Sequence, residues 1–167
     1  MNENETHLEA LINTYGLQPL IPEGGYFNKI YPLVDSNEVI SRASAIYYLM
    51  SGSSFSSMHR LTGDEIWHYY SGDPVEQIQI YPDGTLKRII LGADPERGDL
   101  RMAVVPAGVW QGTKILNVKA GFALCGCTVI PEYTDESYTH GVFSDLVNLY
   151  PQHEETIARF CYTDEKG

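Results

Sequence analysis

One short segment, residues 52–72, carries a histidine and a glutamate at a spacing suited to acid–base chemistry. His59 precedes a turn at residues 62–64, and Glu65 follows that turn at once. If the turn closes a hairpin, the two side chains meet on one inner wall, because alternate residues of a strand share a face. An imidazole beside a carboxylate can hold or move a proton near neutral pH. The alternative is a structural hydrogen bond that only fixes the hairpin.

The residues around this pair are candidates for the wall of a ligand pocket. If residues 65–69 form a strand, Trp67 and Tyr69 share the face of Glu65. Tyr69 or Tyr26 could supply a proton, and aromatic rings offer a flat apolar surface to a sugar ring or an aromatic ligand. Plain core packing is the alternative for both Trp67 and Tyr69. The candidates for ligand contact are Glu23, Trp67, Gln111, Arg60 and His68.

His68 is a separate case among these candidates. On a regular strand it faces away from Glu65, because three positions separate the two residues. A β-bulge could turn it inward. The alternative is that His68 makes structural hydrogen bonds elsewhere.

Composition favours one β-rich domain with an acidic surface. The chain has 167 residues, which suits a single domain over residues 1–167, and its 12 Tyr favour sheets. A net charge of −11 argues against nucleic-acid partners and anionic membranes, because like charges repel. The N-terminus lacks the basic and apolar regions of a secretory signal, and no apolar run nears the ~20 residues of a membrane span. We therefore expect a cytoplasmic protein.

The three cysteines, Cys125, Cys127 and Cys161, predict buried and reduced thiols. Cys125 and Cys127 lie two positions apart in an apolar run, so they would share a face of a strand. A Cys-x-Cys spacing matches neither the zinc-finger nor the thioredoxin motif. We therefore expect these thiols to pack as small hydrophobic groups.

A helix is expected over about residues 6–15, near the N-terminus. Thr6 and Glu9 have the spacing of a capping box, in which two side chains bind free amides of the first turn. Apolar residues then recur at helical spacing. Gly16 is placed to end the helix in a left-handed conformation.

Short strands with turn signals between them follow at intervals of about 8–12 residues, which predicts an antiparallel sandwich or barrel. The barrel core is expected over about residues 20–135, with short helices over about residues 144–160 in which Pro151 suits a first position. The firmest hairpin joins residues 75–81 and 86–91 across a Pro-Asp-Gly turn. Other strands are expected over residues 26–31, 45–50, 101–106 and 122–130, with a loop over residues 35–42.

The spacing around His59 resembles the first signature of the cupin superfamily, a His-x-His pair and a Glu between two glycines. One extra residue precedes His59, and Leu61 stands where the second His belongs. The second signature is matched at Pro106-Ala107-Gly108, but Gln111 stands at its His position and Ile115 at its Asn. Of the usual three His and one Glu, His59 and Glu65 remain.

Longer blocks are similar to those of one small, functionally uncharacterised cupin family, and they occur in order over about residues 8–160. The blocks are residues 22–26, 64–74, 105–111 and 126–131. The resemblance implies an all-β fold, a cupin double-stranded β-helix (jelly-roll) barrel with an N-terminal helix and short C-terminal helices. It also implies a homodimer or a higher homo-oligomer. It brings no established reaction.

A metal centre is one alternative for the site, with His59, Glu65 and Gln111 as ligands. Imidazole and carboxylate suit Fe, Mn, Ni, Cu or Zn, and a catalytic metal usually has three protein ligands. Gln111 offers only a neutral amide oxygen, and Leu61 offers no ligand atom. We therefore expect no cofactor, or at most a weakly held divalent metal.

Two functions from different classes suit these residues. The first is a metal-independent enzyme similar to cupin sugar epimerases and isomerases, with His59 as general base, Glu65 as its partner, and Tyr26 or Tyr69 as the acid. The second is a non-catalytic module that binds a small polar, sugar-like or aromatic molecule. A metal-dependent, dioxygenase-like enzyme is a third reading.

Overall fold

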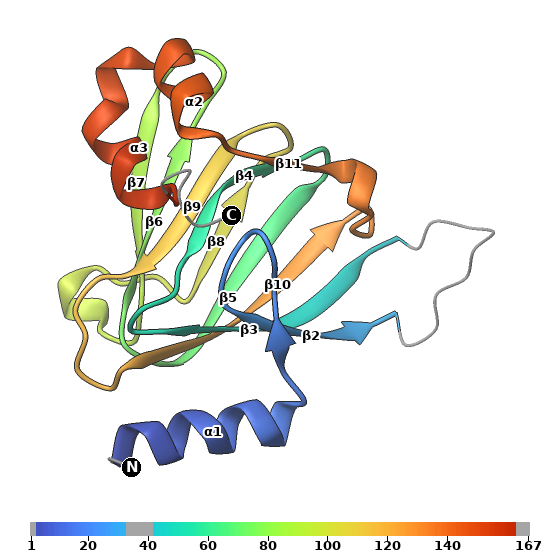
Figure 1. Cartoon of the computed structure of the whole chain (residues 1–167), viewed down its shortest axis with the longest axis vertical. Helices are drawn as coiled ribbons and strands as arrows, with labels where there is room; N and C mark the ends of the chain where they lie inside the picture. Colours follow the sequence, from blue (N-terminus) through green and yellow to red (C-terminus); the bar gives the residue numbers. More distant parts are fainter. Residues whose placement is uncertain (1–2, 33–41, 163–167) are drawn as a thin grey trace.

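Two antiparallel sheets pack face to face as a barrel in a computed structural model of the chain (Figure 1). The structure describes residues 3–32 and 42–162. The all-β fold expected from the sequence is confirmed. The loop expected over residues 35–42 falls outside the described residues except for Arg42.

The six-stranded sheet has the order β1-β2-β3-β10-β5-β8, and the five-stranded sheet has the order β11-β4-β9-β6-β7. The first sheet consists of β1 (Gln18–Pro19), β2 (Tyr26–Tyr31), β3 (Ser44–Ser51), β10 (Phe122–Ile130), β5 (Asp64–Gly72) and β8 (Met102–Val105). The second consists of β11 (Tyr138–His140), β4 (Ser56–Leu61), β9 (Trp110–Ile115), β6 (Val75–Ile80) and β7 (Leu86–Leu91). The expected strands are confirmed to within one residue at each end, and the β6–β7 hairpin turns at Gly84 with φ of 83°.

The turn at residues 62–64 does not close a hairpin, which corrects the expectation from the sequence. β4 pairs with β9 and β11, whereas β5 pairs with β10 and β8 in the other sheet. The chain therefore crosses between the sheets here, and Gly63 passes so close to Ile130 that a Cβ would lie 2.7 Å from its carbonyl oxygen. As a result, His59 and Glu65 face each other across the barrel rather than along one ladder.

Large side chains from both sheets fill the interior of the barrel. Trp67 is 1% exposed and meets the ring of Tyr48 edge to face, with ring centroids 5.3 Å apart. Tyr69, Cys125 and Cys127 belong to the same buried cluster. All three cysteines are buried and form no disulfide, as expected from the sequence.

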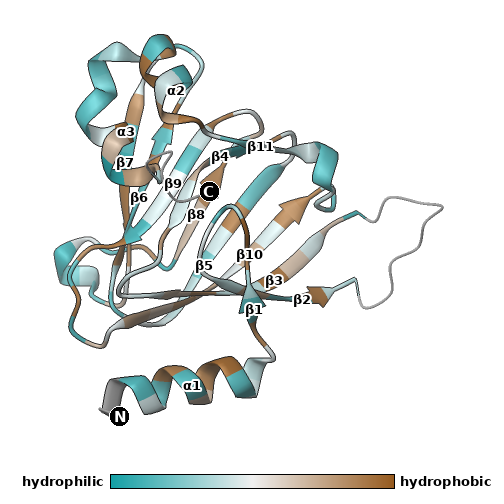
Figure 2. Ribbon diagram, viewed as in Figure 1, coloured by the Kyte–Doolittle hydropathy of each residue, from teal (hydrophilic) through white to brown (hydrophobic). Residues whose placement is uncertain are grey.

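The helix α1 (Glu3–Tyr15) lies outside the six-stranded sheet, with its apolar positions shown in brown in Figure 2. Leu8, Leu11, Ile12 and Tyr15 pack against a cluster that contains Leu17, Leu49, Phe122 and Leu124. Gly16 has a φ of 61° and ends the helix as expected. The capping box expected at Thr6 is wrong, because the chain is already helical at Glu3 and Thr6 lies inside the helix.

The C-terminal segment covers the outer face of the five-stranded sheet (Figure 1). It contains α2 (Phe143–Leu149), a 3₁₀ turn that Pro151 begins (Pro151–His153), and α3 (Glu154–Phe160). Its buried side chains Leu146, Ile157 and Phe160 pack on Met58, Ile78 and Ile80. Two further 3₁₀ turns cover Pro95–Arg97 and Asp135–Ser137. No helix within residues 3–32 and 42–162 is long and apolar enough to cross a membrane.

Replacing Glu76 with glutamine is expected to lower the free energy of unfolding by about 1–2 kcal/mol. The buried Glu76 carboxylate accepts from Arg88 on β7 and from Arg159 on α3, each at 2.6 Å, and so ties α3 to the sheet. Both arginines are about half exposed, so solvent screens the pairs and limits the effect. Urea unfolding measures the loss, and amide hydrogen exchange should quicken in α3 first.

The matched control for this substitution is Glu154→Gln. Glu154 is an exposed carboxylate at the start of the same helix. It should cost less than about 0.5 kcal/mol. Equal effects of the two substitutions would contradict the role assigned to Glu76.

Candidate functional site

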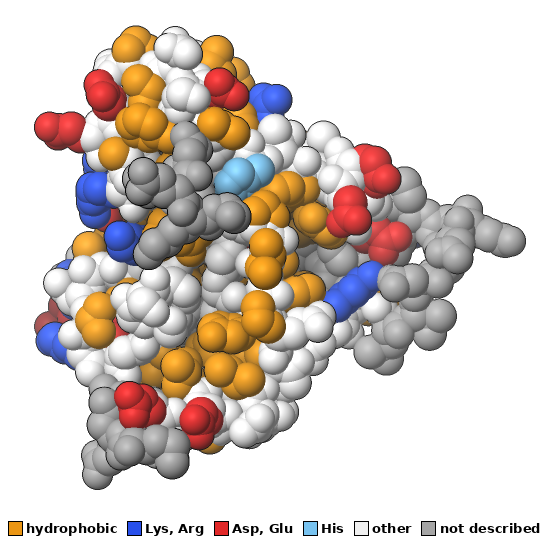
Figure 3. Space-filling view, in the orientation of Figure 1, with side chains coloured by type: hydrophobic (Ala, Val, Ile, Leu, Met, Phe, Trp, Pro, Cys, Tyr) orange, Lys and Arg blue, Asp and Glu red, His pale blue; other side chains and the backbone are white. Residues whose placement is uncertain are grey.

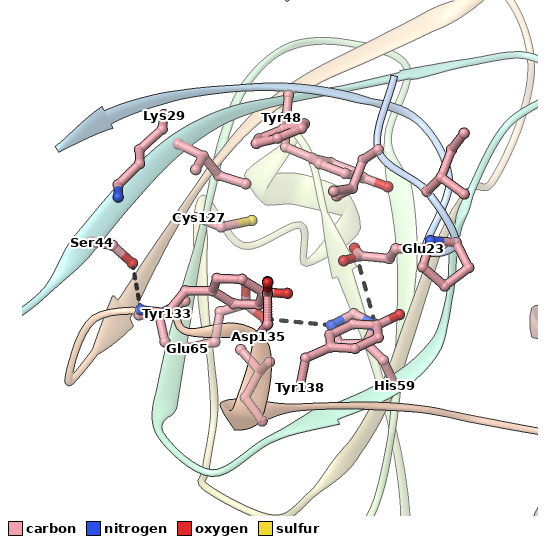
Figure 4. Close-up of a pocket in the computed structure, with 17 residues that line it drawn as sticks. Glu23, Lys29, Ser44, Tyr48, His59, Glu65, Cys127, Tyr133, Asp135 and Tyr138 are labelled. Carbon is pink, nitrogen blue, oxygen red and sulfur yellow. Dashed lines mark hydrogen bonds and ion pairs between the residues drawn. The ribbon is translucent and has the colours of Figure 1, made fainter. Parts of the chain in front are cut away.

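A cavity of about 420 Å³, partly open to solvent, lies inside one end of the barrel, between the two sheets (Figure 4). Its polar lining consists of Glu23, Lys29, Ser44, Tyr48, His59, Glu65, Cys127, Tyr133, Asp135 and Tyr138. Its apolar lining consists of Leu20, Ile21, Pro22, Phe27, Ile46, Leu61 and Val129. The lining of the cavity therefore comes from both sheets and from the segment between β1 and β2.

His59 occupies this wall with only 2% of its surface exposed. Its Nδ1 lies 2.8 Å from the carbonyl oxygen of Ser57, so Nδ1 carries a hydrogen and donates it. Its Nε2 lies 3.9 Å from Oε2 of Glu65, which is longer than a hydrogen bond. Nε2 is therefore the ring nitrogen that can meet a bound molecule.

Glu23 approaches the same imidazole from the loop after β1. Its Oε1 lies 4.0 Å from Nδ1 of His59 and accepts from the hydroxyl of Ser56 at 2.6 Å. Figure 4 shows Glu23 and Glu65 on different sides of the His59 ring. The sequence suggested Glu23 from its position alone, and the structure brings it to the centre of the site.

Two opposing effects set the charge of His59. Burial by itself lowers the pKa of His59, but the negative charges of Glu23 and Glu65 outweigh burial and raise that pKa from 6.5 to about 9. Burial also raises the pKa of Glu23, while the positive charge of His59 opposes that shift. The imidazole therefore carries a proton at neutral pH.

Gln111 supports Glu65 from behind. Its Nε2 donates to Oε2 of Glu65, and its Oε1 accepts from Nε1 of Trp67 at 3.0 Å. The indole can only donate and the carboxylate can only accept, so these partners fix the orientation of the amide. Gln111 and Trp67 therefore hold Glu65 in place from outside the cavity lining.

The donor set around His59 does not fit a firmly held metal ion. No group of three or more His, Cys, Asp or Glu side chains in the described part of the chain has the geometry of a metal site. The amide oxygen of Gln111 is already bound to Trp67. Leu61 supplies apolar surface at the position of a second histidine. Glu23 adds a second carboxylate beside His59, but in the described residues these side chains are not arranged as the three ligands that a catalytic metal usually has.

Six predicted site residues lie away from the cavity lining: Gln111 and Trp67 behind Glu65, and Tyr69, Tyr26, Arg60 and His68 elsewhere. Tyr69 faces the interior, but it lies further along β5, where its hydroxyl donates to the carbonyl oxygen of Gly72. Tyr26 belongs to the outer cluster beneath α1, because its neighbour Phe27 takes the inward position on β2. Neither tyrosine is therefore placed to return a proton to a molecule at His59.

Arg60 and His68 face outward. Arg60 is exposed, and its guanidinium lies 4.8 Å from the ring centre of Trp110. His68 is half-buried, and its Nε2 lies 3.2 Å from the hydroxyl of Thr128. Both residues alternate with inward-facing residues of their strands. His68 therefore makes a structural hydrogen bond and does not turn into the cavity.

Sequence reasoning missed the tyrosines that do line the cavity. Tyr138 lies parallel to His59, with ring centroids 5.4 Å apart and an angle of 21° between the rings. Tyr133 and Tyr48 complete the aromatic lining. The inward parity of β3 could have indicated Tyr48. Tyr133 precedes a 3₁₀ turn and Tyr138 begins a three-residue strand, and elements this short leave no periodic signal.

The fold and this cavity are those of a cupin barrel. Similar solved structures include the Shewanella oneidensis protein SO0799, with a TM-score of 0.86 at 28% identity over 93% of this chain and 98% of that one. A hypothetical protein from Leishmania major has a TM-score of 0.83 at 32% identity, over 92% and 98%. Bacillus subtilis oxalate decarboxylase has a TM-score of 0.57 at 9% identity, over 89% and 38%, and this likeness concerns the fold alone.

Residues 9–140 match the family described as Cupin superfamily (DUF985), and the chain belongs to this family. Its sequence is also 27% identical to the uncharacterized protein YML079W of Saccharomyces cerevisiae. That match covers 83% of this chain and 77% of the yeast protein. The family membership expected from the sequence blocks is thus confirmed.

Proposed function

We propose that this chain binds a small polar organic molecule inside the barrel and moves a proton on it without a metal, as isomerases and epimerases do. One observation carries the proposal. A buried imidazole lies 4.0 Å from one carboxylate and 3.9 Å from another, on the wall of a cavity inside the barrel. Titratable groups that shift one another's pKa values inside a cavity are typical of sites of acid–base catalysis.

The charges assign a role to each group. His59 carries a proton in the free site, so it acts as the proton donor rather than as the general base expected from the sequence. Glu23, whose pKa is raised by burial, is the base. A C–H proton next to a carbonyl passes to Glu23, and the Nε2 proton of His59 passes to the carbonyl oxygen, which leaves an enol. The reverse steps return the proton of Glu23 to the carbon and the enol O–H proton to His59, and exchange of the Glu23 proton with solvent before this return would leave a solvent proton on the carbon.

Solvent exchange tests this proposal. Ligands are first selected by thermal shift from sugars, keto acids, amino compounds and purines, and each is then incubated with the full chain in D₂O. Catalysis should replace the acidic C–H by deuterium, which proton NMR detects. His59→Gln should slow the exchange by about a hundredfold. The matched control is His153→Gln, because His153 binds the carbonyl oxygen of Gly84 away from the cavity.

The other outcomes separate the alternatives. A ligand that raises the melting temperature but never exchanges or changes would refute catalysis and favour a non-catalytic binding module. Exchange that disappears with a chelator and returns with a divalent metal would favour a metal-dependent cupin enzyme. Absence of any thermal shift across the four ligand classes would contradict the proposal as a whole.

A further inference from the structure

The charges that line the cavity are unbalanced toward negative. Three carboxylates line it, those of Glu23, Glu65 and Asp135, against the two cationic side chains of Lys29 and protonated His59. Figure 3 shows acidic side chains at several places on this face, including a group on the right that lies beside hydrophobic and cationic ones. The chain as a whole carries a net charge of −11, which attracts cations from solution.

The negative charge affects the pKa values of Tyr48, Tyr133 and Tyr138, which line the cavity. Burial raises the pKa of Tyr48 and of Tyr138, and the negative charge of Glu23 raises both further. Burial likewise raises the pKa of Tyr133 to about 12, with Asp135 and Glu23 adding to the shift. Burial is the largest cause of the raised pKa in all three tyrosines, and the further rise caused by the carboxylates is the part that reports their negative charge in the cavity.

The wall also offers a flat surface to a cation. Tyr138 lies parallel to the ring of His59, at 5.4 Å between centroids, and His59 is itself a planar cation at neutral pH. Positive groups bind to aromatic faces at such distances. Tyr48 and Tyr133 line the same cavity, so further ring surface is present there.

The two inner carboxylates keep capacity to accept hydrogen bonds. Glu23 accepts from Ser56, and Glu65 accepts from Gln111, whereas a carboxylate can accept about four. Neither carboxylate lies within hydrogen-bond distance of His59. The site therefore holds acceptors for the N–H groups of a bound molecule.

We propose that the ligand of this cavity is a small organic cation, an amine- or amidine-bearing molecule whose N–H groups donate to Glu23 and Glu65. Its flat part lies against the tyrosine wall. The inference rests on the proposed function, because it names the kind of molecule on which that site acts. Phosphates and carboxylates are disfavoured by the same charges. A bound cation also lowers the pKa of His59 toward neutrality, where proton transfer is most effective.

Three probes of equal shape and different charge test the inference. Benzamidine is a cation, benzamide is neutral and benzoate is an anion, and each fits a cavity of about 420 Å³. Isothermal titration calorimetry on the full chain should show benzamidine binding about tenfold or more tighter than benzamide, with benzoate weakest. Benzoate binding as tightly as benzamidine would overturn the inference.

A charge-removing variant locates the effect. Glu23→Gln should weaken benzamidine binding about tenfold and benzamide binding much less, because the neutral amide loses no charge partner. The matched control is Glu9→Gln, which removes the same charge from the exposed face of α1, outside the sheet. Equal losses in the two variants would overturn the inference. The probe series on the unaltered chain gives the answer should Glu23→Gln fail to fold.

The affinity for benzamidine should also rise between pH 6.5 and 9, because protonated His59 competes with the bound cation. The groups that face His59 are Glu23 from the β1–β2 loop, Glu65 from β5, Gln111 from β9, and Tyr138 and His140 from β11. His59→Gln should remove the dependence on pH. An affinity that is flat over this range would contradict competition with His59 and overturn the inference.

Failure of this inference can be told from failure of the proposed function. If benzamide and benzamidine bind equally, the inference fails while the cavity remains a ligand site. If none of the probes binds at millimolar concentration, and solvent exchange is still found with an uncharged ligand, the inference again fails alone. If neither binding nor exchange occurs with any compound, both fail together.

Discussion

Raising the pH from 6.5 to about 9 is expected to lower the free energy of unfolding by on the order of 3 kcal/mol. The pKa of His59 is higher in the folded chain than in the unfolded one, so the folded state binds this proton more tightly. The resulting stabilisation is complete below pH 6.5 and is lost as the pH rises through 9. Urea unfolding at several pH values measures the slope.

Other groups bound the pH window of this experiment. Burial raises the pKa of Glu23, so its contribution has the same sign but begins to fall at lower pH, above its ordinary value of 4.5. Burial lowers the pKa of His140, which acts in the opposite direction near pH 6.5. Burial raises the pKa of Cys125 and Cys127, and both add to the loss only as the pH nears 9.

The variant His59→Gln isolates the contribution of the imidazole. It should be less stable than the unaltered chain at pH 6.5, because Glu23 and Glu65 lose their counter-charge. The slope between pH 6.5 and 9 should largely disappear in this variant. A slope that persists in His59→Gln, or a flat profile in the unaltered chain, would refute the pKa assigned to His59.

Asp73→Ala is expected to destabilise the fold by about 3–5 kcal/mol. The Asp73 carboxylate is 3% exposed and accepts from the backbone amides of Lys119, Ala120 and Gly121, at 2.8–3.1 Å. It thereby fixes the connection between β9 and β10 to the turn that precedes β6. Alanine leaves all three amides without this acceptor, and β10 is the central neighbour of β3 and β5.

Asp83→Ala is the matched control for this substitution. Asp83 accepts from one amide, that of Thr85, in the exposed β6–β7 turn. Its removal should change the urea midpoint little, whereas Asp73→Ala should lower the midpoint strongly with a similar slope. Asp73→Asn should fall between the two, because an amide oxygen retains part of the acceptor role. An unfolding midpoint for Asp73→Ala close to that of Asp83→Ala would show that the loop does not depend on this carboxylate.

Much of the fold could be predicted because its signals are local. The Pro-Asp-Gly turn between two strand-forming segments fixes the β6–β7 hairpin within a few residues. The sequence does not show whether the turn at residues 62–64 closes a hairpin. A tight turn between two strands has the same residue pattern whether the strands pair or belong to two sheets. Only long-range pairing of β4 with β9, and of β5 with β10, decides between these outcomes.

The residues of the candidate site also differ in whether local sequence signals could place them. His59 and Glu65 lie close together in sequence and share a signature, so sequence reasoning brought them together. Tyr69 shares the inward face of Glu65, but four residues along a strand separate them by roughly 13 Å. Tyr138 comes from a strand at the other end of the chain, and its place over His59 follows from its pairing with β4. Distances along strands and pairings between distant strands are what the sequence pattern leaves out.

His59 and Glu65 belong to opposite layers although only five residues lie between them. The distance between the two layers therefore affects the pKa of His59, because it sets the distance from His59 to Glu65. A bulkier residue anywhere between the layers would thicken the sandwich, weaken the pull of Glu65 on the imidazolium and lower its affinity for the proton. Hydrostatic pressure, which acts first on voids, would do the reverse. The titration of His59 therefore depends in part on the distance between the two layers at this end of the barrel, beside the contribution of Glu23.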